Sequence, residues 1–202
     1  MGVAVVARFW SRYGLWVHYS ILSISGLAVL VTLVDPGLRS IDAVGGPIFV
    51  STAIIILLTL LLLPQMGKAE FRRRYRGVGA FLSQYLRQCS PWIPVLHAVF
   101  FAIGLWITVS AFATAPQHST VAAGNGVFFV LQDTGKTAIS ARQYDLMSAA
   151  LKVWYPVGAA ILLQVPVILF HLADRFIGVD PGQWTMSRNP QGRNPWARRA
   201  AN

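Results

Sequence analysis

Charged residues are scarce in this chain: they make up 12% of its 202 residues, whereas 55% are hydrophobic. Ordinary soluble domains carry about 25% charged residues. The mean hydropathy, +0.54, is correspondingly high. These figures exclude an ordinary soluble globular domain and indicate an integral membrane protein.

Cysteine is almost absent as well. Cys89 is the only one, so the chain cannot form an intramolecular disulfide. Acidic residues number only seven, and the sequence contains no paired carboxylates, no nucleophile elbow and no metal-type spacing of Cys and His. It therefore predicts a non-catalytic protein. The net charge of +10 does not indicate a nucleic-acid partner, because no nucleic-acid-binding motif surrounds the arginines.

Four long apolar segments occupy much of the chain, at 15–34, 47–64, 93–112 and 153–173. Each is long enough to cross ~30 Å of hydrocarbon at ~1.5 Å per residue. The sequence thus predicts an all-α integral membrane protein with four transmembrane helices in two hairpins, 15–64 and 93–176. Residues 1–14 are expected to form an interfacial lead-in or the first turns of the first spanning helix. The second segment is almost purely Ile and Leu and is expected to face lipid or a partner subunit.

A basic segment at 65–92 separates the two hairpins. Its aromatic and apolar residues recur every three or four positions, which predicts an interfacial amphipathic helix with arginines on the opposite face. A second basic segment is the proline-rich tail at 177–202. Arginines of both segments are candidates for binding anionic lipid or an acidic partner subunit: Arg72, Arg73, Arg74, Arg76, Arg87, Arg188, Arg193, Arg198 and Arg199.

Basic residues are distributed unevenly between the two sides of this threading. Thirteen of the 17 Lys and Arg residues fall on the side that holds both termini and the segment 65–92. By the positive-inside rule that side is cytoplasmic, so we expect both termini inside and a bacterial inner-membrane location. No removable signal peptide is expected. The tryptophans near the predicted boundaries, among them Trp10, Trp16 and Trp154, are typical of aromatic belts.

The segment 113–139 is the predicted extracytoplasmic insert. The apolar run 127–131, the turn residues 133–135 and the run 137–139 favour a small β-hairpin. Ser140 is expected to cap a helix that begins amphipathic and continues as the fourth span. Pro156 and Pro166 lie inside that helix, and each predicts a kink.

Three histidines lie at the same end of three predicted spans: His18, His97 and His171. Each has a small or polar residue two turns away on its own face, namely Ser25, Gly104 and Gln164. Ionisable groups at membrane depth suggest a functional site, here ligation of a haem b or a metal, or a hydrogen bond to a quinone. The alternative is that they are buried histidines hydrogen-bonded between helices.

The first apolar segment resembles the opening helix of the membrane-bound cytochrome b subunits of dehydrogenases, because Trp16 and His18 enter an apolar helix that contains Gly26. The resemblance covers under a tenth of the chain. In that family the histidine and glycine stand farther apart, and further helices supply paired histidines. With one histidine in each of three spans and none in the second, the resemblance implies at most one haem.

The leading functional prediction is an accessory or scaffolding subunit of a larger inner-membrane assembly for secretion, conjugation or respiration. Membrane lipids and other subunits would be its partners, and it would need no cofactor. The first alternative is a cytochrome b-like electron-transfer subunit that binds one haem or quinone through His18, His97 and His171. The second is a small transporter or channel, which the lack of charged residues at mid-depth disfavours.

Overall fold

The structure is a computed structural model. It describes residues 2–62, 79, 83, 86, 90–115, 119–124, 126–132 and 135–176, without the side chains of 2–4, 7, 8, 11, 62 and 173–176. The predicted basic segment falls almost wholly outside these residues. The tail lies outside them entirely, as do all nine arginines predicted to bind lipid or partners.

Helices dominate the described residues. The long ones are α1 (Gly2–Val34), α2 (Gly45–Leu62), α5 (Trp92–Thr114) and α7 (Tyr155–Phe176). The shorter α6 (Ala141–Ala149) leads into α7 through a π-helix, Ala150–Trp154. Among the described residues four stretches are helical, long and apolar enough to cross a membrane, as predicted. They are Arg12–Val34, Arg39–Leu61, Trp92–Thr114 and Ala141–Leu172.

The start of the chain does not form a separate helix. α1 runs without interruption from Gly2 to Val34, so residues 2–14 are the first turns of the first long helix. A turn with a short 3-10 helix, Arg39–Ile41, connects α1 to α2.

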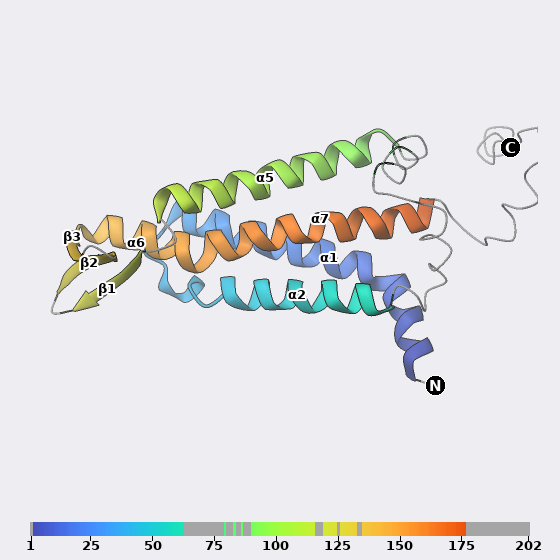
Figure 1. Cartoon of the computed structure of the whole chain (residues 1–202), viewed down its shortest axis with the longest axis horizontal. Coiled ribbons are helices and arrows are strands. Elements are labelled where there is room, and N and C mark those ends of the chain that lie inside the picture. The colour runs from blue at the N-terminus through green and yellow to red at the C-terminus, as the bar shows by residue number, and fades with distance from the viewer. Residues whose placement is uncertain are drawn as a thin grey trace, which may run out of the picture.

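α7 is the central helix of the bundle. It packs against α1, α2 and α5, whereas α5 packs chiefly against α7 and the π-helix before it (Figure 1). Gly104 of α5 and Gly158 of α7 permit this close approach, because a Cβ on Gly158 would meet both the Thr108 side chain and the Gly104 carbonyl oxygen. Small residues at such contacts are how helices pack without a hydrophobic driving force between them.

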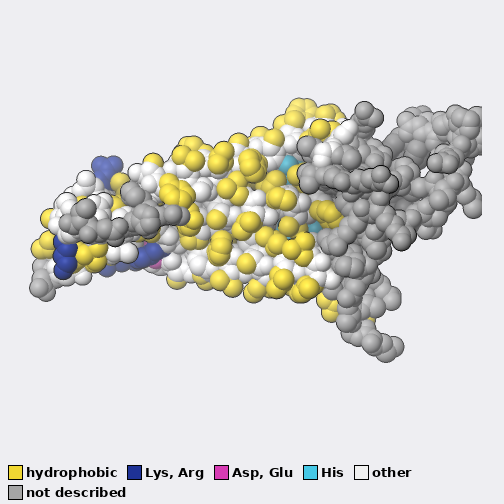
Figure 2. Space-filling model, in the orientation of Figure 1, with side chains coloured by type: hydrophobic (Ala, Val, Ile, Leu, Met, Phe, Trp, Pro, Cys, Tyr) yellow, Lys and Arg dark blue, Asp and Glu magenta, His cyan; other side chains and the backbone are white. Residues whose placement is uncertain are grey.

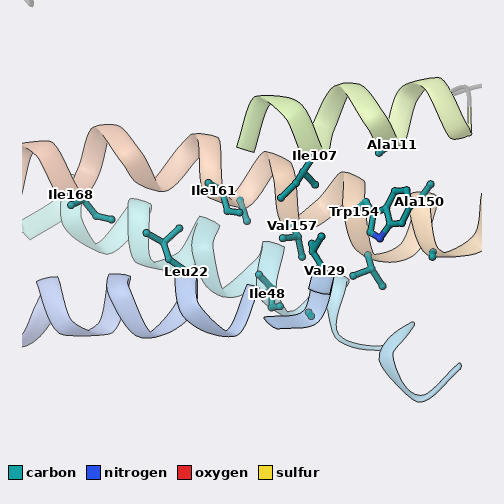
Figure 3. Packing of buried hydrophobic residues seen from close by; sticks show 14 of the residues in the cluster. Leu22, Val29, Ile48, Ile107, Ala111, Ala150, Trp154, Val157, Ile161 and Ile168 are labelled. Carbon is teal, nitrogen blue, oxygen red and sulfur yellow. The ribbon is translucent and has the colours of Figure 1, made fainter. Parts of the chain in front are cut away.

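Buried residues recur every seven positions in each long helix. The series are His18, Ser25 and Thr32 in α1; Gly45, Thr52 and Thr59 in α2; His97, Gly104 and Ala111 in α5; and Val157, Gln164 and His171 in α7. A repeat of seven keeps one face of a helix turned toward its neighbours along the whole contact. Apolar residues fill the spaces between these positions, and Val29, Ile48 and Val157 meet from α1, α2 and α7 (Figure 3).

The outside of the bundle is apolar. Large side chains such as Trp16, Leu30, Leu57 and Trp106 are each more than half exposed. Figure 2 shows hydrophobic side chains over the middle of the bundle and Lys and Arg at the end that carries the sheet. An exposed apolar surface of this size is compatible with a multi-pass membrane protein.

A small antiparallel sheet lies at one end of the bundle, which we call the sheet end (Figure 1). Within the described part of 119–139 it has the order β1-β2-β3. β2 (Val127–Gln132) and β3 (Gly135–Ile139) form the predicted hairpin, and β1 (Thr120–Gly124) is a third strand that the prediction missed. Ser140 caps α6 as predicted, in a capping box with Gln143.

The π-helix lies immediately before Pro156. Proline has no N–H, so the carbonyl of Lys152 cannot receive the usual helical hydrogen bond from residue 156. That carbonyl lies against Gly45 at the start of α2, where a Cβ would collide with it. The Lys152 side chain reaches the α1–α2 connection and forms a salt bridge with Asp42 at 2.8 Å. The π-helix therefore contacts both α2 and this connection, while α7 continues through Pro166.

We predict that Gly45→Ala destabilises the bundle by about 1–3 kcal/mol, because the added methyl must displace backbone atoms of the π-helix. Gly46→Ala is the matched control, since a Cβ there meets no atom within 4 Å. Thermal unfolding in detergent, followed by tryptophan fluorescence, should show a lower midpoint for Gly45→Ala alone. Equal midpoints for the two variants would show that the contact does not constrain α2.

Candidate functional site

The seam between α1, α2 and α7 contains most of the buried polar side chains. We use "seam" for this three-helix contact and its buried polar residues, which are Trp10, His18, Ser25, Thr32, Thr52, Thr59, Trp154, Gln164 and His171. Each of these side chains is at most 7% exposed. Unpaired polar groups are costly in an apolar interior, so their partners decide what the seam does.

Three threonines in the seam make the same kind of contact. Each hydroxyl donates to a backbone carbonyl oxygen of its own helix: Thr52 to Ile48 and Thr59 to Ile55, both at 2.8 Å, and Thr32 to Val29 at 3.0 Å. Because its proton is used in this way, the oxygen is left to accept a hydrogen bond from another helix.

Each of these oxygens receives one such bond. Gln164 Nε2 donates to Thr52 at 2.9 Å, Trp10 Nε1 to Thr59 at 3.1 Å and Trp154 Nε1 to Thr32 at 2.7 Å. From Trp10 to Thr32, α1 rises by about 33 Å, close to the thickness of a bilayer's hydrocarbon core. The three contacts therefore join the helices over the full length of the seam.

His18 and His171 meet in the half of the seam away from the sheet. Their ring centroids lie 5.5 Å apart with a tilt of 49°. Trp10 packs its edge against both rings, at 6.0 Å from His18 and 6.5 Å from His171. Gly14 leaves the room for this cluster, because a Cβ there would lie 3.2 Å from Trp10 and 3.4 Å from His171.

His97 is buried separately, on α5, with 2% of its surface exposed. Its Nδ1 lies 2.7 Å from the carbonyl oxygen of Ile93. A carbonyl can only accept, so Nδ1 carries the proton and Nε2 is left with a lone pair. Of the three predicted histidines, the structure thus brings His18 and His171 into ring contact and places His97 apart from them. Within the described residues no three metal-ligating side chains gather in one group.

A few buried polar atoms of the seam are not satisfied by the described part of the chain. They include both ring nitrogens of His18, the hydroxyl of Ser25 and Oε1 of Gln164. Gln164 lies close enough to His18 for an interaction, although neither ring nitrogen completes a well-formed hydrogen bond. His18 also faces His171 and is fully buried, so it is the residue of the seam best placed to bind something additional.

One prediction about this region was incomplete and another was wrong. The second span was expected to face lipid or a partner subunit, and most of its large side chains are exposed, but Thr52 and Thr59 place one of its faces in the seam. Trp10 and Trp154 were expected in an aromatic belt, but each is 7% exposed and donates a buried hydrogen bond. The repeat of seven from Gly45 through Thr52 to Thr59 was the sequence signal for this seam. Trp16, at 68% exposed, does lie on the outside.

Comparison with known proteins gives no relative for this chain: no family model, curated protein or solved structure matches it.

We predict that Thr52→Val destabilises the bundle by about 1–2 kcal/mol, because valine keeps the shape but leaves the buried Gln164 amide without its acceptor. Ser51→Ala is the matched control, since Ser51 is the neighbouring hydroxyl on the exposed face of α2. Unfolding of Thr52→Val, Gln164→Leu and the double variant should yield a coupling energy between the two positions. Additive effects would contradict the proposed contact.

Proposed function

We propose that this protein is a non-catalytic accessory or scaffolding subunit of a larger bacterial inner-membrane assembly, of the kind used for secretion, conjugation or respiration. Its four spanning helices would place both termini in the cytoplasm. The observation that carries the proposal is how the seam uses its polar groups. Thr32, Thr52 and Thr59 bind side chains of neighbouring helices, so the buried polarity holds the helices in a fixed arrangement.

The distribution of charge supports this proposal. Among the described side chains, the acids Asp35, Asp42 and Asp145 belong to the sheet end, where Asp42 pairs with Lys152 and the other two flank Gly37. The excess of arginines lies in the segment 65–92, between the end of α2 and the start of α5 in the chain, and in the tail, which follows α7. Basic segments of this kind suit anionic lipid or an acidic subunit.

The proposal predicts that the protein co-purifies with other subunits when membranes are extracted in a mild detergent. Replacing Arg188, Arg193, Arg198 and Arg199 by Gln should lower the yield of these subunits at least several-fold. The yield should stay low at every salt concentration. Arg142→Gln is the control, because Arg142 is an exposed arginine at the sheet end. Intact-mass analysis of the extract measures the yield of co-purified subunits for each variant. Recovery of the wild-type chain alone would contradict the proposal.

The second candidate is a cytochrome b-like subunit that holds one haem or quinone. His97 supports it, because its Nδ1 contact with Ile93 directs a lone pair of Nε2 away from its own helix. An axial ligand of a haem is oriented in this way. A haem held between His18 and His171 is disfavoured, since the macrocycle would have to separate two rings that lie against each other and against Trp10.

An absorbance spectrum separates the two candidates. The protein is produced in cells supplied with a haem precursor and purified in detergent. A cytochrome b-like subunit should then show a Soret band that is lost in His97→Ala. We expect no such band if the protein is an accessory subunit, and a Soret band at one haem per chain would replace the leading proposal with the second.

A further inference from the structure

His18 and His171 form a pair of imidazoles enclosed by the bundle. The two side chains are 0% and 4% exposed, and they come from different helices, α1 and α7. Their ring centroids are 5.5 Å apart. Two imidazoles that bind one ion, each nitrogen about 2 Å from the ion, have ring centres roughly 5 Å apart at a tetrahedral angle and roughly 6 Å apart in a linear two-ligand geometry, and the observed distance lies between these values. The pair therefore needs little movement to share a single ion.

His18 requires a partner that the described residues do not provide. Neither of its ring nitrogens forms a hydrogen bond with the described part of the chain. In an apolar environment an unsatisfied polar group costs several kcal/mol, so a ligand bound at His18 would remove an energetic penalty. Ser25 lies two turns away from His18 along the helix, and its hydroxyl is also unsatisfied.

A chain of hydrogen bonds beside His18 fixes the orientation of one neighbour. The Thr52 hydroxyl donates to the carbonyl of Ile48 and accepts from Gln164 Nε2. The amide of Gln164 cannot be reversed without losing that bond. Its Oε1 therefore remains as a hydrogen-bond acceptor close to His18. An acceptor of this kind stabilises the N–H of a histidine whose other nitrogen binds a metal.

The charge of the surroundings selects the ion. Among the described side chains, all the acids lie at the sheet end, so within this part of the chain the histidine pair has no anionic side chain beside it. The cost of burying an ion grows with the square of its charge, and a dication without an anionic ligand would be strongly disfavoured. Copper is an ion that imidazole binds well, and in its cuprous state it carries a single charge.

From these observations we propose that His18 and His171 together bind one Cu(I) ion inside the bundle. The ion bridges α1 and α7, Trp10 covers it on one side, and the Gln164–Thr52 contact orients His18. This site is independent of the scaffolding function: an accessory subunit with no partner bound would still take up copper. His97 is not part of it.

The test uses the full chain with Cys89→Ser, because a thiol binds Cu(I) tightly and would mask a weaker site. Purified protein is titrated anaerobically with Cu(I) in competition with a chromogenic Cu(I) chelator, and copper per chain is measured by elemental mass spectrometry. We expect about one copper per chain, and X-ray absorption should show nitrogen ligands at about 2 Å. His18→Ala and His171→Ala should each weaken binding at least tenfold, and His97→Ala, the matched control, should not.

A folding defect in these variants is recognised separately. Copper bound only to the folded state raises the unfolding midpoint, so Cu(I) should stabilise the Cys89→Ser chain and the His97→Ala variant but not His18→Ala. Copper below a tenth of an equivalent, equal loss in His97→Ala, or retention in His18→Ala would each overturn the proposal. Binding of Zn(II) as tight as that of Cu(I) would overturn the charge argument.

Discussion

The hydrogen bond from Gln164 to Thr52 is the interaction on which the seam depends most. It joins α7 to α2 within a contact whose other members are largely apolar. Leu, Ile and Val side chains can slide past one another at low cost, whereas a buried amide must remain next to its acceptor. The bond thus fixes how far α7 is shifted along its axis relative to α2. Apolar packing alone would specify this shift less strictly.

The same reasoning applies to the two indole contacts. Trp10 ties the start of α1 to the end of α2, and Trp154, the last residue of the π-helix before α7, ties that helix to the end of α1. With Gln164 in between, three directional bonds fix three helices near the ends and at the centre of the contact. α5 is positioned by shape, through Gly104 and Gly158. The bundle therefore combines two ways of specifying helix contacts, one polar and one steric.

Much of the architecture was predictable from the sequence because it follows from length and hydropathy. Segments such as 93–112 are long and apolar enough to predict a helix that could span a membrane, and the structure places α5 at Trp92–Thr114. The pattern at 127–139 predicted two strands, and Ser140 predicted a cap. β1 was missed because its sequence, Thr-Val-Ala-Ala-Gly, has no alternation of large apolar and polar residues. Its position is set by pairing with β2, which no local signal reports.

The site was less predictable. The predicted threading placed the three histidines at the same end of the bundle. It did not indicate that His18 and His171 are in contact while His97 is not. That difference arises from the rotation of each helix about its axis, which packing determines. Trp10 illustrates the limit well: its position near a boundary is typical of an interfacial residue, yet Gly14 one turn later leaves space for it to turn inward.

The π-helix before Pro156 has a geometrical consequence for the end of the molecule that carries the sheet. A π-turn accommodates one residue more than an α-turn, so it rotates everything that precedes it by about 100° relative to an uninterrupted α-helix. α6 and the three strands attached to it therefore owe their azimuth around the bundle to a single extra residue in Ala150–Trp154. An insertion or deletion in this turn would redirect the whole sheet while leaving the four long helices as they are.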